Sequence, residues 1–423
     1  MQDAELLASW GIDYLKLDGC NVWAEDGNSL REYRVRYMQW NDVLSAMSNP
    51  LIFSNSAPAY FEDEVPNWAV IMNWVPESGG LARHLADVIV YSSNGSAWDS
   101  IMYNYDFHAR LVRYQQPGYH NDPDFLIPDH PSLSKSRFAL ISALAPPPSR
   151  TRKLHSLATR LSRDGTFDVL SHSLENGDRI LTTLNRGADA ATTTVSLARL
   201  GLSSHSGRKY DAHDPVTDQV STIDSAIEIQ LDSHVAKVYR IALPISCTKT
   251  TPTGMVLNTP SGLCMTASTD SVIFEKCSAS DSQAWFIYFG IQRRFGVVWH
   301  VAATGDATKL TLSPLSDASV CLAAGDGVSL AKCQSGIGIT WDNYISGHLR
   351  NSSGSCLTQS KNQASIEECV IDSVGQIFGL PSGVHLANGR LKLTLIRISV
   401  KLMSEPRDLM WVYLLYMMHL AFI

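Results

Sequence analysis

The sequence predicts a multidomain protein in which a parallel α/β unit is followed by an antiparallel β-sandwich and then by a cysteine-rich repeat unit. Three observations predict this order. Up to about residue 144, short apolar runs alternate with amphipathic stretches. From residue 166 the hydrophobic period changes to two, which is typical of half-buried strands. Beyond residue 246 lie seven of the eight cysteines.

Length and charge limit the partners that the protein can have. With 423 residues, 45% of them hydrophobic, the chain can bury at least two cores. Its formal net charge of −7 disfavours binding to nucleic acid or to an anionic membrane surface. Residues 409–423 are almost wholly apolar, but 15 residues are fewer than the roughly 20 that a membrane-spanning helix needs. We therefore expect a neutral partner, no nucleic acid and no membrane.

The first unit is assigned to residues 1–148. Residues 12–18 have the pattern of a buried strand, residues 30–47 that of a helix and residues 51–54 that of the next strand. Three consecutive prolines at 146–148 end this alternation. The pattern predicts a parallel arrangement in which helices connect neighbouring strands.

A linker and a sandwich are expected next. Residues 149–163 carry five basic side chains and no acidic one, which predicts a linker over 149–165. Residues 166–243 hold several short runs of alternating apolar and polar residues, separated by glycine-containing turns such as Glu175–Asp178. This pattern predicts an antiparallel β-sandwich.

Six cysteines of the next unit, residues 247–381, form three pairs with similar spacing: Cys264 and Cys277, Cys321 and Cys333, and Cys356 and Cys369. Three similar loops suggest three structural repeats. Zinc sites usually show Cys-x-x-Cys pairs or nearby histidines, and neither is present, so disulfides are favoured over zinc. Cys247 has no evident partner, and residues 382–423 form a tail of unclear structure.

Disulfides indicate an oxidising compartment. Sequons at Asn94 and Asn351 are candidate glycosylation sites and fit a secreted protein, although such triplets also arise by chance. The first residues, however, lack the charged start and apolar stretch of a signal peptide.

Three short segments of the first unit could carry chemistry. Asp18 ends an apolar strand, where α/β barrels place reacting groups, and Lys16 precedes it by two residues on the same face. The structural alternative for Asp18 is a helix N-cap. Arg83 and Asp87 are spaced i, i+4, so an exposed ion pair is their alternative. Asp122 and Asp124 flank a proline, and calcium binding is the rival interpretation for them.

Together, residues 10–20, 83–87 and 121–124 resemble glycoside hydrolase family 27, the α-galactosidases, and particularly the secreted fungal enzymes. The resemblance implies a retaining mechanism on a (β/α)8 TIM barrel, with Asp18 as the nucleophile and Asp87 as the acid/base. It also implies that Lys16, Arg83 and Asp124 contact galactose hydroxyls. Such an enzyme needs one ionised and one protonated carboxyl group. No cofactor and no metal is expected.

Two aromatic residues of the first unit, Trp74 and Tyr60, are possible stacking surfaces for a sugar. For both of them a place in the core is the favoured interpretation.

The later units also resemble known domains. Residues 166–243 are similar to the β-sandwich that follows the barrel in this family. The cysteine repeats resemble a ricin B-type lectin, a β-trefoil that binds carbohydrate, because Gln283-Ala284-Trp285 matches its Gln-x-Trp signature. Trp341 and residues 376–378 occupy degenerate copies. The aspartate that usually follows the first cysteine of each repeat is absent, so the fold is better supported than sugar binding.

The first unit departs from the family pattern in one respect. The family's nucleophile lies on the fourth of eight barrel strands, whereas Asp18 is near the start of this chain. A partial barrel is therefore expected, in which the first three strands and the partner of Cys20 are missing. Cys20 would then be a free thiol.

Three functions remain open. The first is the release of terminal α-linked galactose from oligo- and polysaccharides. The second is an α-N-acetylgalactosaminidase, which differs in the room that residues 54–58 leave beside the sugar's 2-position. The third is an inactive fragment that acts only as a carbohydrate-binding protein.

Overall fold

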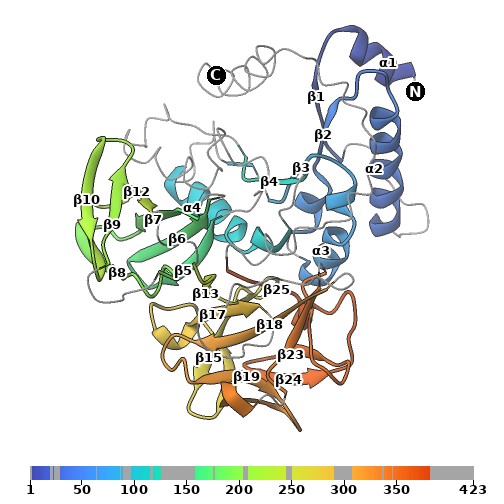
Figure 1. The fold of residues 1–423 in the computed structure, drawn as a ribbon. Coiled ribbons are helices and arrows are strands. Elements are labelled where there is room, and N and C mark those ends of the chain that lie inside the picture. The colour runs from blue at the N-terminus through green and yellow to red at the C-terminus, as the bar shows by residue number, and fades with distance from the viewer. Residues whose placement is uncertain are drawn as a thin grey trace.

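The computed structural model describes residues 2–19, 22, 29–62, 64–85, 87–88, 97–114, 118–124, 158–174, 177–202, 208–243, 250–289, 307–335, 338–344 and 346–381. These residues form three units that contact one another (Figure 1). The predictions for Cys20, Asn94, Cys247 and the tail 382–423 lie outside the described residues. None of the described helices is long and apolar enough to span a bilayer.

The first unit is built on a parallel sheet whose four strands lie in sequence order, β1 (Tyr14–Leu17), β2 (Ile52–Asn55), β3 (Leu81–Arg83) and β4 (His120–Asp122). Its α-helices are α1 (Gln2–Ser9), α2 (Ser29–Ser45), α3 (Val65–Met72) and α4 (Ala97–His108), and its short 3-10 helices are η1 (Ala57–Phe61), η2 (Val75–Glu77) and η3 (Leu111–Tyr114). Parallel neighbours require crossover connections, and helices supply them here. The predicted strand–helix–strand alternation over residues 12–54 is confirmed.

The core of this unit lies between the helices and the sheet. Tyr37 of α2, Phe53 of β2 and Ile71 of α3 are at most 3% exposed and belong to one apolar cluster. The buried residues of α2 and α3 share this cluster with β2 and β3, whereas those of α4 pack against the sandwich.

The second unit consists of two antiparallel sheets. Six strands form the larger sheet in the order β10-β9-β12-β7-β6-β5, and two strands, β11 and β8, form the smaller one. The strands are β5 (Thr159–Arg163), β6 (Phe167–Ser173), β7 (Arg179–Asn185), β8 (Ala191–Ser196), β9 (Tyr210–Asp214), β10 (Gln219–Ile223), β11 (Ala226–Leu231) and β12 (Ala236–Ala242). Leu181 of the larger sheet and Ile229 of the smaller one share one core. The predicted sandwich is confirmed.

The predicted linker 149–165 is wrong for its last part. Thr159–Arg163 form strand β5, which pairs with β6 at the edge of the larger sheet. Arg160 and Arg163, two of the five basic residues that suggested a linker, form ion pairs with Asp168 and Asp106 rather than being solvated. Arg160 donates two hydrogen bonds to Asp168, and both side chains are at most 3% exposed. Residues 149–157 lie outside the described part of the chain.

The third unit is a β-structure made of three disulfide-closed hairpins. Its strands are β13 (Thr253–Met255), β14 (Leu257–Asn258), β15 (Cys264–Ser268), β16 (Ser271–Glu275), β17 (Ala284–Phe289), β18 (Ala307–Pro314), β19 (Val320–Ala324), β20 (Val328–Lys332), β21 (Trp341–Tyr344), β22 (Leu349–Arg350), β23 (Cys356–Ser360), β24 (Gln363–Glu367) and β25 (Phe378–Gly379). Its 3-10 helices are η5 (Asp281–Gln283), η6 (Cys333–Ser335) and η7 (Val374–Gln376). The hairpins β15/β16, β19/β20 and β23/β24 meet where β16 pairs with both β20 and β24.

All three predicted disulfides are present, Cys264–Cys277, Cys321–Cys333 and Cys356–Cys369, with Cα–Cα distances of 5.1, 5.0 and 5.1 Å. In each hairpin the first cysteine lies near the start of the first strand and the second lies just beyond the end of the second strand. These bonds confirm the preference for disulfides over zinc.

The predicted glycosylation site at Asn351 stays a prediction. Its side chain is buried, and its Oδ1 accepts hydrogen bonds from Ser353 N, Ser353 Oγ and Ser355 N. Through these bonds the asparagine shapes the turn before β23.

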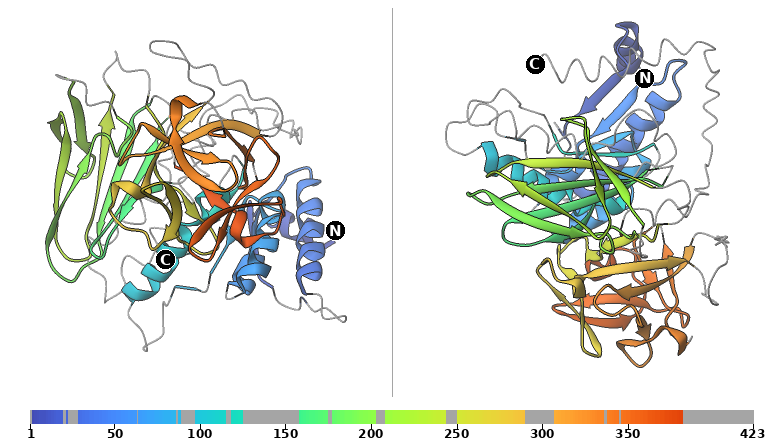
Figure 2. Two further views of the ribbon diagram at one scale, coloured as in Figure 1. Left: turned by 90° about the horizontal axis from the view of Figure 1, so that it is seen from below. Right: turned by 60° about the vertical axis from the view of Figure 1, so that its left-hand side comes forward.

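The three units pack on one another, as two further views show (Figure 2). Val88 and Trp98 of the first unit share an apolar cluster with Leu170 and Ala236 of the sandwich. Ile377 of the third unit belongs to the core of the first unit. The sheet that carries the candidate site is therefore supported by both neighbours.

Candidate active site

The sequence-predicted residues lie along one edge of the parallel sheet. Leu17, Asn55, Ala82 and Asn121 are register partners across the four strands. The carboxyl ends of the strands therefore meet at the same edge, which is where α/β proteins place reacting groups.

Asp18 follows directly after β1 and faces a cation. Its Oδ1 lies 3.4 Å from Nζ of Lys16, and the two side chains are 52% and 31% exposed. Lysine within an otherwise apolar strand needs a charged partner, and Asp18 supplies it. The carboxylate is thus open to a ligand while a positive charge lies beside it.

Hydroxyl groups hold the peptide groups on both sides of Asp18. The Leu17 carbonyl accepts hydrogen bonds from Tyr37 Oη at 3.1 Å and from Ser56 Oγ at 2.5 Å. The Gly19 N–H donates to Tyr60 Oη at 2.8 Å. Burial raises the pKa of Tyr37, so its hydroxyl remains a donor. The backbone that carries Asp18 is fixed from α2, from the β2 end and from η1.

Close packing explains the glycine after Asp18. A Cβ at Gly19 would lie 2.6 Å from Tyr33 Oη and 2.7 Å from the Tyr60 ring. These distances are shorter than van der Waals contact, so a side chain there would displace the tyrosines. Only glycine brings the backbone this close to Tyr60.

Asp87 belongs to a second group, which is centred on Arg83 of β3. Arg83 Nη2 lies 3.0 Å from Asp87 Oδ1, and Arg83 Nη1 lies 2.6 Å from Asp124 Oδ1. The Asp87 side chain is 86% exposed, whereas those of Arg83 and Asp124 are 4% and 2% exposed. The buried pair therefore anchors an exposed carboxylate at the sheet edge.

The turn after β4 is shaped by its two aspartates. Asp124 has a φ of 81°, and its N–H donates to Asp122 Oδ1 at 2.9 Å. Asp124 Oδ2 accepts from the Val88 N–H, which ties this turn to the segment after β3. Burial raises the pKa of Asp122. No group of three or more metal-binding side chains occurs among the described residues, so the calcium alternative gains no support there.

The structure separates the two aromatic candidates. Trp74 is 4% exposed and lies in the core of the first unit, as favoured by the sequence. Tyr60 is 48% exposed, so its expected place in the core is wrong. Its ring lies 5.4 Å from that of Tyr33, and its hydroxyl contacts the backbone beside Asp18.

The predicted residues thus form two groups on one edge of the sheet, with β2 between them. One group is Lys16 of β1 with Asp18 just after it. The other is Arg83 of β3 with Asp87 and Asp124.

Sequence reasoning missed the positioning roles of Tyr37 and Ser56. Asp122 was a sequence candidate, and it ends β4 in the register of Arg83. The two hydroxyl residues gave no signal, because they act on a backbone carbonyl far away in the sequence.

Comparisons with known proteins agree with this arrangement. Residues 1–160 match a family described as "Alpha galactosidase A", and residues 164–241 match "Alpha galactosidase C-terminal beta sandwich domain". The Aspergillus niger protein "Alpha-galactosidase A" is 44% identical over 91% of this chain and 73% of its own length. The chicken "Alpha-N-acetylgalactosaminidase" is 32% identical over 34% of this chain and 35% of its own.

Among solved structures, α-galactosidase I from Mortierella vinacea aligns with a TM-score of 0.47 and 17% identity, over 58% of this chain and 71% of that one. The relationship rests on the sequence matches, which cover both the sheet and the sandwich. The chain belongs to the glycoside hydrolase family 27 α-galactosidases.

Proposed function

We propose that the protein is a retaining α-galactosidase that releases terminal α-linked galactose from oligo- and polysaccharides. The observation that carries this proposal is the pair of exposed carboxylates, Asp18 and Asp87, each beside a cation at the carboxyl edge of the parallel sheet. A retaining glycosidase needs two such groups, about 5 to 5.5 Å apart when the sugar lies between them.

The reaction proceeds in two displacements. In the first, the Asp18 carboxylate forms a bond to the anomeric carbon while the bond to the leaving oxygen breaks, and the proton of Asp87 passes to that oxygen. In the second, Asp87 takes a proton from water, and the water oxygen replaces Asp18 at the anomeric carbon. Two inversions give net retention. The hydroxyls that hold the peptides around Asp18 keep the nucleophile in line.

Lys16, Arg83 and Asp124 are proposed to contact the sugar hydroxyls. Lys16 is 31% exposed at the edge and can donate to a hydroxyl. Arg83 already binds both aspartates, but its Nε has no hydrogen-bond partner within the described residues. Asp124, which is 2% exposed, would contact the sugar from the same buried pair.

Replacing the nucleophile tests the assignment. Asp18→Asn removes the attacking charge and keeps the size of the side chain, so hydrolysis of an aryl α-galactoside should fall by about 10³-fold or more. Asp42→Asn, on an exposed position of α2, is the matched control and should keep the parent rate. An Asp18→Asn protein that hydrolyses the substrate as fast as the parent would show that the nucleophile is a different residue.

An α-N-acetylgalactosaminidase remains the alternative within the family, since the chicken enzyme of that name matches residues of this chain. The deciding segment follows β2, where Ser56 and Ala57 are both buried. Small side chains there leave room beside the sugar. Parallel assays with aryl α-galactoside and aryl α-N-acetylgalactosaminide separate the two activities.

For the third unit we propose a ricin B-type β-trefoil on a secreted protein. Three disulfide-closed hairpins that meet at β16, β20 and β24 support the fold, and the disulfides fit an oxidising compartment. If the protein does not hydrolyse an aryl α-galactoside but is retained on a galactose matrix, the function of a protein that only binds carbohydrate is favoured instead.

A further inference from the structure

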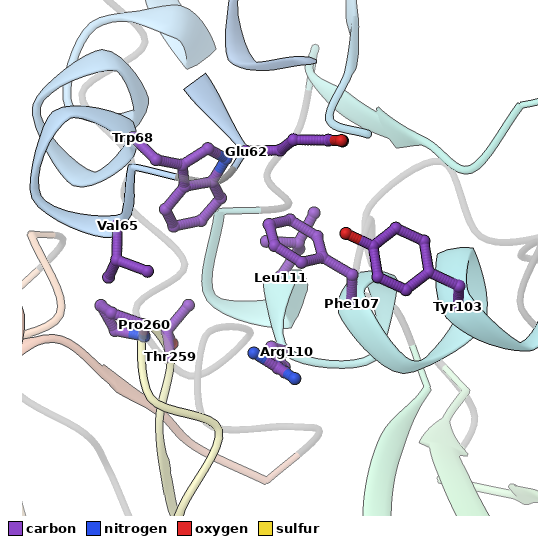
Figure 3. A pocket seen from close by; sticks show the side chains of 9 residues that line it. All are labelled: Glu62, Val65, Trp68, Tyr103, Phe107, Arg110, Leu111, Thr259 and Pro260. Carbon is purple, nitrogen blue, oxygen red and sulfur yellow. The ribbon is translucent and has the colours of Figure 1, made fainter. Parts of the chain in front are cut away.

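A pocket lies where the first unit meets the third (Figure 3). Its volume is about 160 Å³, and it is lined by Glu62, Val65, Trp68, Tyr103, Phe107, Arg110, Leu111, Thr259 and Pro260. The first seven come from η1, α3, α4, η3 and adjoining turns, and the last two from the turn after β14. None of them is among the proposed catalytic or substrate-contacting residues, so this is a separate site.

Aromatic side chains form its walls. The Trp68 ring meets the Phe107 ring edge to face, with centroids 5.3 Å apart and planes at 87°. Tyr103, one turn before Phe107 on α4, is 52% exposed. Aromatic walls give a ring-shaped ligand apolar contact area, and a tyrosine that stays partly exposed adds a polar group.

Two buried polar atoms of the lining have no partner within the described residues. They are Nε1 of Trp68, which is 3% exposed, and Oγ1 of Thr259, which is 2% exposed. Leaving a donor unsatisfied in a buried place is unfavourable, so such atoms point to a ligand or water that binds them. The two atoms come from different units of the chain.

Arg110 adds a further donor. Its guanidinium lies 5.8 Å from the centre of the Phe107 ring, and it passes close to Gly262, where a Cβ would lie 2.8 Å from its Nε. It forms no ion pair with any described residue, and burial lowers its pKa. Glu62 supplies a carboxylate in the same lining. The pocket thus offers both cationic donors and an anionic acceptor between aromatic walls.

We propose that this pocket binds one neutral pyranose unit and takes no part in catalysis. A cavity of about 150 Å³ holds one unsubstituted six-membered ring such as benzene, so this pocket has room for a single sugar ring at most. A purely apolar ring would leave Trp68 Nε1 and Thr259 Oγ1 unsatisfied, and an anion would face Glu62. A pyranose has hydroxyl groups that both donate and accept, and its C–H face packs on aromatic rings. Because two units line the site, the bound sugar also stabilises their contact.

The test follows the indole N–H of Trp68 by NMR in the full chain labelled with ¹⁵N-tryptophan. The probes are methyl β-D-glucopyranoside and methyl α-D-mannopyranoside, which are not α-galactosides, so the readout does not depend on the proposed hydrolysis. Trp68→Phe assigns the resonance. We expect the Trp68 indole resonance to shift as the sugar is added and the shift to reach a plateau, because the indole N–H gains a hydrogen-bond acceptor. The indoles of Trp285 and Trp341 already donate to Met265 O and Leu322 O and should not move.

Variants that keep the aromatic walls make the test specific. Thr259→Val and Arg110→Met should each raise the dissociation constant by about 3- to 10-fold. Thr222→Val and Arg36→Met are the matched controls. Both residues lie outside the pocket, so these variants should leave the dissociation constant unchanged. A Trp68 resonance that does not move with either probe up to about 50 mM, well above a millimolar constant, overturns the proposal. So does binding that both pocket variants retain unchanged.

Discussion

At the scale of single residues, Asp18 depends on groups that hold its backbone rather than its carboxylate. Tyr60 binds the N–H of Gly19, and Tyr37 and Ser56 bind the carbonyl of Leu17. A nucleophile must be held within a fraction of an ångström of its reacting position, and small displacements cost much of the rate.

Tyr60→Phe tests this arrangement. It removes the hydroxyl and keeps the ring, so kcat for an aryl α-galactoside should fall by about 3- to 30-fold, since one hydrogen bond and some alignment are lost. KM should change less than kcat, because the carboxylate itself remains. Tyr344→Phe, which removes a hydroxyl that accepts from Arg350, is the control in the third unit. Equal effects of the two variants would contradict a role in positioning.

The residue scale also shows how far a sequence can be read. Asp18 and Asp87 could be found because each stands in a short motif at a strand end. The positioning roles of Tyr37 and Tyr60 could not be found, because each depends on a backbone group 20 or 41 residues away. Arg83 could be named from the sequence, but its burial between two aspartates could not.

At the scale of elements, the Gln-x-Trp signature of the third unit is a structural brace. Gln283 Oε1 accepts from Ser278 N, while its Nε2 donates to Thr266 Oγ1 and to Lys276 O. Gln376 repeats this pattern in the third hairpin with Val370 N, Thr358 Oγ1 and Glu368 O. The glutamine thus ties the first and the third disulfide loop to their hairpins.

Gln283→Met should destabilise the third unit. The apolar side chain fills the same space but leaves buried polar groups unpaired, which costs about 2–4 kcal/mol of unfolding free energy. Gln363→Met, at an exposed position of β24, should change it by less than about 0.5 kcal/mol. The unfolding free energy of each variant is measured by denaturant titration, with hydrogen exchange of the β15 and β16 amides as the readout for the third unit. Equal stability of the two variants would contradict the brace.

The strands of the sandwich differ in how well their sequence predicts them. β6, β7 and β12 alternate apolar and polar residues and could be located from the sequence. The outer strands β9 and β10 could not, because β10 is exposed over four of its five residues. β5 was not predicted because its arginines suggest a solvated linker when only the local sequence is considered. In the structure they pair with Asp168 and Asp106.

At the scale of the whole molecule, Asp106 joins the first unit to the sandwich. From α4 it accepts two hydrogen bonds each from Arg163 of β5 and from Arg186. Burial by itself would raise its pKa, but the two arginines outweigh burial and lower the pKa below the ordinary value of 3.8.

This pKa predicts how the contact depends on pH. A carboxyl whose pKa is lowered by folding stabilises the native state above its unfolded pKa, and that contribution is lost as the pH falls through the folded pKa. Asp106→Asn should therefore destabilise the protein at pH 7, by about 1–3 kcal/mol. The difference from the parent should shrink below about pH 4.

Urea unfolding of the parent and of Asp106→Asn, at pH 7 and at pH 3, measures the difference in unfolding free energy. Asp342→Asn, which removes an exposed pair with Lys309, is the control and should cost less than about 1 kcal/mol at either pH. A difference between the parent and Asp106→Asn that stays constant from pH 7 to pH 3 would contradict the assignment.

The sequence by itself determined the order of three units, the parallel and antiparallel strand patterns, the three disulfides and the strand-end carboxylates. These features depend on the spacing of nearby residues and on the hydrophobic period along the chain, both of which can be read from the local sequence. Only the tertiary structure decided which hydroxyls hold Asp18, which arginines are buried, and that a pocket opens between the first and third units. Each of these depends on contacts between segments far apart in the chain, and no local pattern records which distant side chain will fill a given space.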